Sequence, residues 1–269
     1  MKIVIPTYKR PSVLRDKSLA LLWRLGFDKS DVVILLSEGD PSEYEKIYPN
    51  FHIIKVKANT AAEKFNAAHR VYPKGTRVLL FEDDIDDIVQ KNDLKQSPVS
   101  AENFQMIATK SFEYCEKIGA KIWGMCPTPN GFYMKNRICH GLKFCVANVY
   151  GFISDPDRQN SVDVNLPSKT DYERSIRYFI RDGATVRADM ISPITKNYKN
   201  SGGLQDLAAG KRLAYENAAV SELLSKYPTL VRRNLNRVGE YPEIVIKPAP
   251  KDPEKYKQLI LQLRRQRAF

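Results

Sequence analysis

The stretch 77-RVLLFEDDIDDI-88 places an apolar run, residues 77–81, directly before a dense group of carboxylates. The run is typical of a buried strand, and the acids that follow it are Glu82, Asp83, Asp84, Asp86 and Asp87. The chain around them is basic, with 43 Lys and Arg against 31 Asp and Glu and a formal net charge of +12. Carboxylates gathered at one strand end repel each other unless a cation lies among them. The stretch therefore indicates a strand end that binds a cation.

Strands and helices are predicted to alternate along the chain. The first four strands are expected at 2–6, 31–40, 52–59 and 77–84, and further strand-like stretches fall within 121–130, 143–156 and 184–198. Helices are expected at 11–26, 41–49, 60–75, 103–119, 170–183, 210–228 and 255–266. This alternation predicts an α/β fold with a mostly parallel sheet flanked by helices. We expect one domain over residues 1–210 and a basic, helical C-terminal extension over 211–269 that packs on it.

Polar residues lie at the carboxyl end of each of the first four expected strands. Thr7 follows the first strand, Glu38 the second and Asn59 the third, and the acidic group follows the fourth. In open α/β sheets the carboxyl ends of parallel strands share one edge, and ligands bind there. The sequence therefore predicts a single polar rim that carries the functional site.

The acidic strand end has two interpretations. A small number of oxygen ligands suits Mg²⁺ or Mn²⁺, which retain waters and bind through substrate phosphates. A solvated helix N-terminus would also favour acids, because of the helix macrodipole. The neighbouring polar strand ends favour the metal site. Asp84 is then the main ligand, and Asp86 is the second because the frame Asp84-x-Asp86 stays open.

Three short motifs resemble those of GT-A-fold nucleotide-sugar glycosyltransferases: 5-IPTYKR-10, 64-KFNAA-68 and 81-FEDDI-85. More narrowly, their combination resembles the TET/JBP-associated glycosyltransferases. That family includes the enzyme that makes base J and phage enzymes that glycosylate modified DNA pyrimidines. The segment 187-RADMISPITKNYKNSGGLQ-205 also looks like that family, and the resemblance covers residues 1–210. It implies a GT-A-like Rossmann-type fold, a UDP-sugar donor (glucose), Mn²⁺ or Mg²⁺, and modified DNA as the acceptor.

The resemblance also implies roles for individual residues. The expected donor-binding residues are Pro6, Thr7, Arg10, Glu38, Lys64, Asn66, Glu82, Asp83, Lys196, Tyr198, Ser201, Gly202 and Gly203. Three alternatives stay open: Arg10 as a surface cation, Glu38 as a solvated loop acid and the glycine loop as an ordinary hinge. Asn is a poor helix-interior residue, so we expect Asn66 to contact the donor nucleotide rather than cap the helix.

The segment 170-TDYERSIRYF-179 resembles the Glu-Asp motif that opens a helix in inverting GT-A enzymes, with Thr170 in place of the Glu. A carboxylate within hydrogen-bond reach of an acceptor hydroxyl can deprotonate it. The resemblance implies Asp171 as the general base and inversion at the anomeric carbon, with Glu173 as the second candidate. The alternative is that Asp171 only complements the helix dipole.

Basic residues are concentrated at the C-terminal end. Residues 228–269 hold ten Lys and Arg against four Asp and Glu. Arginines on phosphates position a nucleic acid with little sequence information. The expected DNA contacts are Arg232, Arg233, Arg237, Arg264 and Arg265.

Composition limits the other classes. The sequence contains no apolar run long enough to predict a membrane span. Its first residues, 1-MKIVIPTYKRP-11, lack the apolar core of a signal peptide. Four dispersed cysteines suit reduced thiols, and with the family resemblance they lead us to expect the cytoplasm of a phage-infected host. Two other functions are weighed: a GT-A enzyme with a glycan, lipid-carrier or protein acceptor, and a non-catalytic DNA-binding module.

Overall fold

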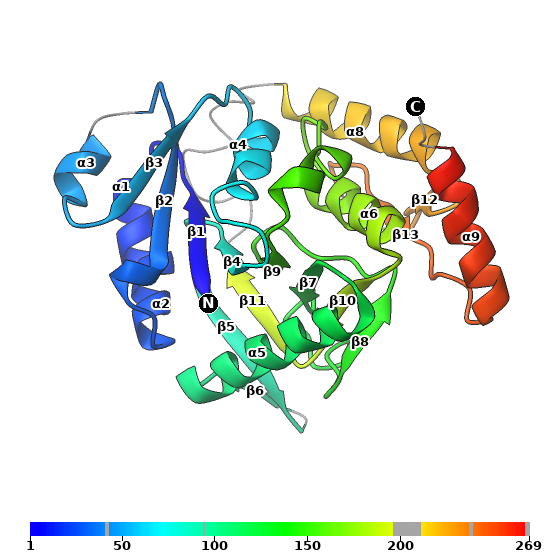
Figure 1. Cartoon of the computed structure of the whole chain (residues 1–269), viewed down its shortest axis with the longest axis horizontal. Coiled ribbons are helices and arrows are strands. Elements are labelled where there is room, and N and C mark those ends of the chain that lie inside the picture. The colour runs from blue at the N-terminus through cyan, green and yellow to red at the C-terminus, as the bar shows by residue number, and fades with distance from the viewer. Residues whose placement is uncertain (41–42, 94, 196–210, 237–238, 267–269) are drawn as a thin grey trace.

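In the computed structural model, residues 1–40, 43–93, 95–195, 211–236 and 239–266 are described. Eight strands form a central sheet in the order β3-β2-β1-β4-β9-β7-β10-β8 (Figure 1). They are β1 (Lys2–Pro6), β2 (Val32–Ser37), β3 (His52–Val56), β4 (Arg77–Phe81), β7 (Ile122–Met125), β8 (Ile138–Gly141), β9 (Val149–Ile153) and β10 (Thr185–Ala188). Strands β1 to β4 pair in parallel and β10 pairs in parallel with β7, whereas β9 and β8 run antiparallel to their neighbours. The predicted α/β fold with a mostly parallel sheet is therefore confirmed.

Helices cover both faces of this sheet (Figure 1). They are α1 (Pro11–Leu14), a π turn (Arg15–Leu19), α2 (Ala20–Arg24), α3 (Glu43–Ile47), α4 (Ala61–Ala68), α5 (Ala101–Ile118), α6 (Thr170–Asp182), α8 (Arg212–Lys226) and α9 (Pro253–Arg265). Short 3-10 turns occupy Lys29–Asp31 and Pro156–Ser161. The helix expected at 11–26 contains the π turn in its middle. It ends before Gly26, which has a φ of +80° that glycine adopts without strain.

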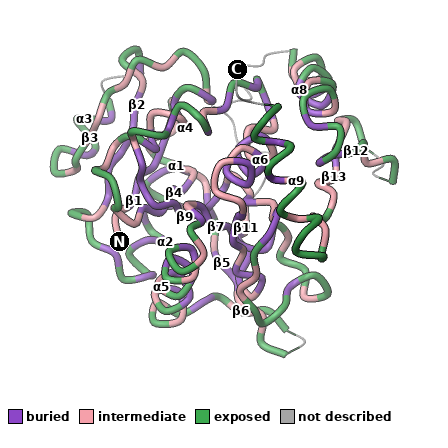
Figure 2. The backbone as a smooth tube through the Cα atoms, turned by 45° about the vertical axis from the view of Figure 1, so that its right-hand side comes forward, coloured by how far each residue is buried: buried purple, intermediate pink, exposed green. Residues whose placement is uncertain are grey.

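The sheet separates two apolar layers because successive side chains on a strand point to opposite faces. On β1, Ile3 and Ile5 pack with α1, α2 and α5, whereas Val4 packs with α4. On β4, Leu79 packs in the first of these layers and Leu80 in the second. Figure 2 shows these strands buried, with exposed residues mainly on loops and outer helix faces. Continuous aliphatic runs thus form strands that are buried on both faces.

A second sheet has the order β11-β5-β6 and consists of β5 (Ile85–Asn92), β6 (Lys95–Pro98) and β11 (Ile191–Thr195). Strand β4 ends at Phe81, so residues 82–84 form a turn between the two sheets. The expected strand over 77–84 is therefore three residues too long. The chain continues as the β5–β6 hairpin rather than as a helix, which excludes a helix N-terminus as the reason for the acids.

The C-terminal elements pack against α6. Residues of α8, α9, β12 (Val231–Arg233) and β13 (Ile244–Ile246) share one hydrophobic cluster with Ile176, Phe179 and Ile180 of α6. The predicted helices at 210–228 and 255–266 are confirmed as α8 and α9. The β12–β13 hairpin between them was not predicted.

Two expectations from composition can be compared with the structure. All four cysteines are free, and three of them are buried. None of the helices that the structure describes combines the length and the apolar character needed to cross a bilayer.

Candidate active site

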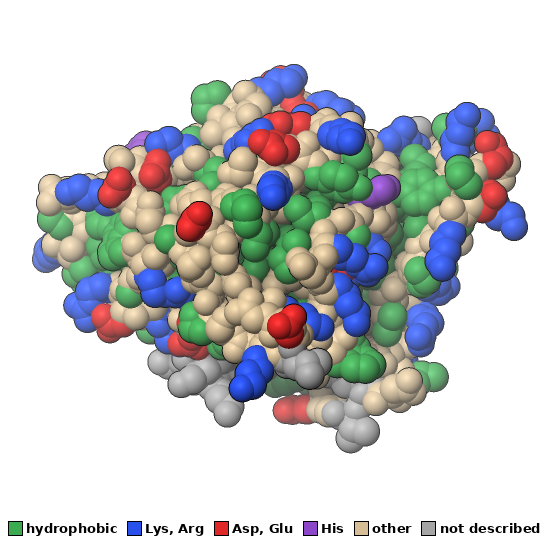
Figure 3. Space-filling view, turned by 90° about the horizontal axis from the view of Figure 1, so that it is seen from below, with side chains coloured by type: hydrophobic (Ala, Val, Ile, Leu, Met, Phe, Trp, Pro, Cys, Tyr) green, Lys and Arg blue, Asp and Glu red, His purple; other side chains and the backbone are tan. Residues whose placement is uncertain are grey.

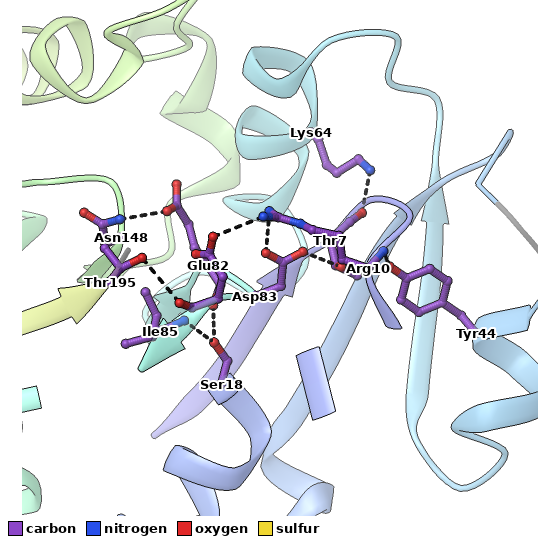
Figure 4. A network of polar contacts seen from close by, with 11 residues as sticks. Thr7, Arg10, Ser18, Tyr44, Lys64, Glu82, Asp83, Ile85, Asn148 and Thr195 are labelled. Atoms are coloured by element: carbon purple, nitrogen blue, oxygen red, sulfur yellow. Dashed lines mark hydrogen bonds and ion pairs between the residues drawn. The ribbon is translucent and has the colours of Figure 1, made fainter. Parts of the chain in front are cut away.

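The first part of the candidate site is a chain of hydrogen bonds at the ends of β1 and β4 (Figure 4). The Arg10 amide donates to the Tyr44 hydroxyl (2.8 Å), which lies 2.9 Å from Thr7 Oγ1, and Thr7 Oγ1 donates to Asp83 Oδ2 (2.6 Å). A hydroxyl has one proton, so Tyr44 donates to Thr7. The loop after β1 is therefore fixed against the acidic turn without any ligand.

Arg10 lies between two of the carboxylates. Its terminal nitrogens are 2.6 Å from Asp83 Oδ1 and 3.1 Å from Asp84 Oδ2. Burial raises the pKa of Asp83 to about 6, although Arg10 and the Thr7 hydroxyl oppose the shift. Arg10 is thus a component of the acidic site and not a solvated surface cation.

Lys64 of α4 supports the same loop from the other side. Its side chain is buried, and Nζ donates to the Thr7 carbonyl (2.8 Å) and to Asp40 Oδ2 (2.9 Å). Asp40 Oδ2 also accepts the Ser37 amide at 2.5 Å. Lys64 therefore joins the ends of β1 and β2, and its ammonium is engaged within the protein.

The acidic turn itself is anchored at both ends (Figure 4). Asn148 Nδ2 donates to Glu82 Oε2 (2.9 Å), and the Glu82 amide donates to the Asn148 carbonyl (2.8 Å). Ser18 Oγ donates to the Glu82 carbonyl (2.6 Å) and accepts the Ile85 amide (3.0 Å). Thr195 Oγ1 donates to the Asp84 carbonyl (3.3 Å). Contacts from α1–α2, β9 and β11 thus fix the backbone that presents the carboxylates.

Burial and crowding change the charge state of Glu82. The pKa of Glu82 is raised to about 8, mainly by burial and also by the charges of Asp84 and Asp83, while Arg10 lowers it. The charge of Asp171 also raises the pKa of Glu82, which places the start of α6 near the acidic turn. The acidic turn therefore holds Glu82 where it binds a proton more readily than an exposed glutamate does.

Asp171 is half-buried in the first turn of α6. Its Oδ1 accepts the Tyr172 amide (3.0 Å), and its carbonyl accepts Ser175 Oγ (2.8 Å), which in turn accepts the Cys145 amide (2.9 Å). Burial raises the pKa of Asp171, and the Arg174 guanidinium is the main influence that lowers it. The side chain is thus held in the first turn of α6 by hydrogen bonds, with a carboxyl pKa above its ordinary value.

Arg174 lies one helical turn after Asp171. It is 2% exposed, and its guanidinium lies 5.0 Å from the ring centroids of both Phe65 and Tyr150. Neither terminal nitrogen has a hydrogen-bond partner among the described residues. A buried cation with two open donor groups is a polar feature of this site that the sequence analysis missed.

Two expected donor-binding residues have other surroundings. Asn66 donates from Nδ2 to the Val164 carbonyl (2.8 Å) and accepts the Val164 amide at Oδ1 (2.9 Å). It therefore joins α4 to the loop before α6, and the expectation that it contacts the nucleotide does not fit these bonds. Glu38 is exposed at the end of β2. Pro6 is buried at the end of β1.

The second metal candidate and the second base candidate both have partners within the protein. Asp86 is on β5 and pairs with Lys17 (3.0 Å). Glu173 is fully buried and binds the Asn165 amide (3.0 Å) and Arg177, so it has a structural role and not that of a base. Five donor-side expectations lie outside the described residues: Lys196, Tyr198, Ser201, Gly202 and Gly203.

The expected DNA-binding arginines are not clustered together. Arg232 and Arg233 are exposed on β12. Arg264 of α9 donates to the Ile180 carbonyl (2.9 Å) and to the Arg181 carbonyl, so it caps α6. Arg265 is exposed on α9, and Arg237 lies outside the described residues. Figure 3 shows Lys and Arg side chains spread over one face with acids among them, rather than a single basic patch.

The residues at this edge fit a divalent cation that is completed by a ligand. Within the described ranges no group of three or more His, Cys, Asp or Glu could hold a metal by itself. Mg²⁺ and Mn²⁺ sites, however, use one or two carboxylates with substrate phosphates and water. Asp84 is half-buried at the turn beside Glu82 and Asp83, and a cation bound there would reduce the repulsion among these carboxylates.

No protein-family profile and no curated protein matches the chain. Among solved structures, residues 1–349 of Staphylococcus aureus TarS superpose with a TM-score of 0.52 and 11% identity, over 83% of this chain and 66% of that one. The complex of the same TarS fragment with UDP-GlcNAc also gives 0.52, with 12% identity, over 83% of this chain and 67% of that one. The mannosyltransferase PcManGT from Pyrobaculum calidifontis, in complex with GDP-Man and Mn²⁺, gives 0.52 with 9% identity, over 99% of this chain and 70% of that one.

This chain spans slightly less than two thirds of the TarS fragment. Identities of this size establish the fold alone, and the narrower resemblance to the TET/JBP-associated enzymes stays a prediction. The chain therefore has the GT-A-like, Rossmann-type fold.

Proposed function

We propose that this chain is a metal-dependent glycosyltransferase that moves glucose from UDP-glucose onto a hydroxymethylated pyrimidine in DNA. The observation that carries the proposal is the fixed acidic turn, Glu82 to Asp84, held against Arg10 at one edge of a GT-A-like sheet, with Asp171 at the same rim. Similar folds with UDP-GlcNAc, or with GDP-Man and Mn²⁺, support a nucleotide-sugar donor.

The donor would bind at the ends of β1, β2 and β4. Thr7 and Pro6 place the backbone of the first loop against the nucleotide, and the exposed Glu38 accepts an N–H of the uracil. Lys64 positions this loop through the Thr7 carbonyl and does not itself contact the donor. Because Thr7, Arg10 and Asp83 are already bonded to each other, little reorganisation accompanies donor binding.

Asp84 would hold the divalent cation together with oxygens of the donor diphosphate and water. When bound, the cation neutralises the charge that gathers on the departing diphosphate. Asp86 is the second candidate ligand: it lies beyond the turn, on β5, where it pairs with Lys17. Lys196, Tyr198 and the glycine loop 201–203 remain proposed as further diphosphate contacts.

Asp171 is proposed as the general base. It takes the proton of the acceptor hydroxymethyl group while that oxygen forms a bond to the anomeric carbon, and the bond from this carbon to the diphosphate breaks with its electron pair. In-line attack of this kind inverts the anomeric configuration. Burial raises the pKa of Asp171, and Arg174, one turn away, opposes this rise and so favours the deprotonated form that a base requires.

A GT-A enzyme with a glycan, lipid-carrier or protein acceptor is the second candidate. Arg264 is engaged in capping α6, which removes one of the arginines expected to contact DNA. The donor side of the site serves both candidates equally, so the acceptor alone distinguishes them.

One assay tests both candidates. The protein is heated with Mn²⁺ and each of a panel of nucleotide sugars, and a donor present at 100 times its dissociation constant adds about 2.7 kcal/mol to the free energy of unfolding. Plain, hydroxymethyluracil and hydroxymethylcytosine DNA are then offered, and the products are weighed by mass spectrometry. A hexose mass on modified DNA alone supports the proposal. Donor hydrolysis without a DNA product favours the second candidate, and no stabilisation by any donor contradicts both.

A further inference from the structure

The end of the β12–β13 hairpin presents an apolar side chain to solvent. Arg233 pairs with Ile244 in the register, and the Asn234 amide donates to the Glu243 carbonyl (2.8 Å), so the paired backbone extends to this point. The next residue, Leu235, is 82% exposed. An exposed leucine on a backbone fixed in this way gains nothing from packing within the chain.

This end of the hairpin is tied to the start of α6. Glu243 pairs with the ammonium of Lys169, whose Nζ also lies 3.1 Å from Glu216 Oε2 of α8. The Lys169 side chain is 9% exposed, and the residue precedes α6 in the left-handed region with a φ of +53°. Asp171 follows two residues later. A buried lysine with two carboxylates therefore ties Glu243, the backbone partner of Asn234, to the start of α6, the helix that carries the proposed base.

The charged side chains that precede Leu235 are two arginines that no acid of the described residues neutralises. Arg232 and Arg233 are exposed and form no ion pair with any residue in the described ranges. The acids at the same end are Glu243, which Lys169 neutralises, and the exposed Glu240.

The arginines of α9 have a different position. Arg264 bonds to the carbonyls of Ile180 and Arg181 at the C-terminal end of α6. Arg181 follows Asp171 by ten positions, which is about 15 Å along a helix that rises 1.5 Å per residue. Of the described arginines expected to meet DNA, those on β12 thus belong to the hairpin that is paired with the start of α6, whereas Arg264 lies at the other end of that helix.

We propose that residues 232–235, on β12 and directly after it, are the DNA-binding element of the acceptor site, with Arg232 and Arg233 on phosphates and Leu235 inserted beside the target nucleotide. This inference rests on the proposed function. An apolar wedge between base steps lowers the cost of turning a nucleotide out of the stack. The displaced base would then bring its hydroxymethyl group toward Asp171.

The test compares two double variants of the full chain that remove equal charge. Arg232→Gln/Arg233→Gln changes the hairpin, and Lys255→Gln/Lys257→Gln changes exposed positions on α9 that were not expected to contact DNA. Fluorescence anisotropy measures binding to a labelled duplex with one hydroxymethylated pyrimidine at several salt concentrations. We expect the hairpin variant to bind at least tenfold more weakly and to lower the slope of log K against log salt by about 2, since each phosphate contact contributes about 0.9. The α9 variant should stay within twofold of wild type.

Leu235→Ala tests the wedge. Duplex binding should stay within threefold of wild type, transfer to duplex should fall about tenfold because the turned-out nucleotide loses its support, and transfer to the same strand without its complement should be unchanged. Stabilisation by Mn²⁺ and donor is measured for every variant as a check on folding and on the donor side.

The outcomes separate the inference from the proposed function. If wild type binds modified duplex and the hairpin variant binds equally well, or if Leu235→Ala loses the same activity on single strands, the inference is wrong and the proposed function stands. If wild type neither binds nor glycosylates any DNA while donor stabilisation is intact, the DNA acceptor and the hairpin role fail together.

Discussion

The donor and acceptor sides of the proposed site are built in different ways. On the donor side, Thr7, Arg10 and residues 82–84 come from two short motifs at the ends of β1 and β4, which are adjacent parallel strands. On the acceptor side, the start of α6 is held by Glu216 of α8 and Glu243 of the hairpin, which follow it by more than 40 residues. Sheet topology alone brings the first set together, whereas the second depends on packing between separate elements. The donor side is therefore the part that a motif can reveal.

Asp84→Asn should have the largest effect and break the donor side. Loss of several kcal/mol of charge stabilisation corresponds to a fall in transfer rate on the order of 10³ to 10⁴. The stabilisation by Mn²⁺ with the nucleotide sugar, read as a shift in Tm, should disappear as well. Asp86→Asn is the matched control and should retain both, since Asp86 pairs with Lys17. Equal losses in the two variants would assign the metal to the other frame.

Asp171→Asn should break the acceptor side while sparing the donor side. Removal of a general base costs about 10² to 10⁴ in rate, and the donor-dependent shift in Tm should stay. Asp157→Asn, at an exposed position on the 3-10 turn, controls for the loss of one acid. An Asp171→Asn protein that transfers sugar at the wild-type rate would show that this residue serves only the helix dipole.

Arg174→Met should sharpen the comparison through the pH dependence of transfer. A base must be deprotonated, so activity falls as the pH drops through its pKa. Burial raises the pKa of Asp171, whereas the charges of Arg174 and Lys169 lower it. Removal of the guanidinium therefore raises this pKa, and the acidic limb of the kcat/KM profile should move to higher pH.

Arg174→Lys keeps the positive charge and provides the control for that profile. It should hold the acidic limb near its wild-type position even if the packing against Phe65 and Tyr150 weakens. Profiles that coincide for wild type and Arg174→Met would show that the buried cation does not act on Asp171.

Asn66→Ala should have the smallest effect on transfer and a measurable effect on stability. It removes both hydrogen bonds to the backbone of Val164, which costs about 1–3 kcal/mol for buried groups left unsatisfied. Chemical unfolding measures this change, and Asn160→Ala on the exposed side of the same loop region controls for the loss of an amide. A large rise in the KM for the donor, with stability unchanged, would instead support the original expectation that Asn66 contacts the nucleotide.

Much of the fold follows from local pattern. Continuous aliphatic runs predicted β1 to β4, and amphipathic spacing predicted α5, α6, α8 and α9. The β5–β6 hairpin was missed because its sequence, rich in Asp, Gln, Lys and Asn, lacks the alternation that marks a strand. The β12–β13 hairpin was missed because three-residue strands are too short to give a periodic signal.

The residues of the candidate site also fall into those that the sequence pattern predicted and those that it did not. Thr7, Arg10 and the acidic turn were predicted because parallel strands must end at one edge, and the structure gives Arg10 two carboxylate partners. Asn148 and Tyr44 carried no such signal, because the sequence alone does not show whether a single Asn or Tyr belongs to a functional site or to the core. Lys64 carried a signal, but its buried position directs it to the Thr7 carbonyl and to Asp40.

The sequence by itself determined that a buried strand ends in carboxylates beside other polar strand ends, because strand direction and hydrophobic periodicity are local properties. Only the tertiary structure decided which of these groups neutralise each other, since the pairing of Arg10 with Asp83 and of Lys169 with Glu216 and Glu243 joins residues far apart in the chain. Charge pairing and burial depend on distance in space, and folding sets that distance through the packing of whole elements.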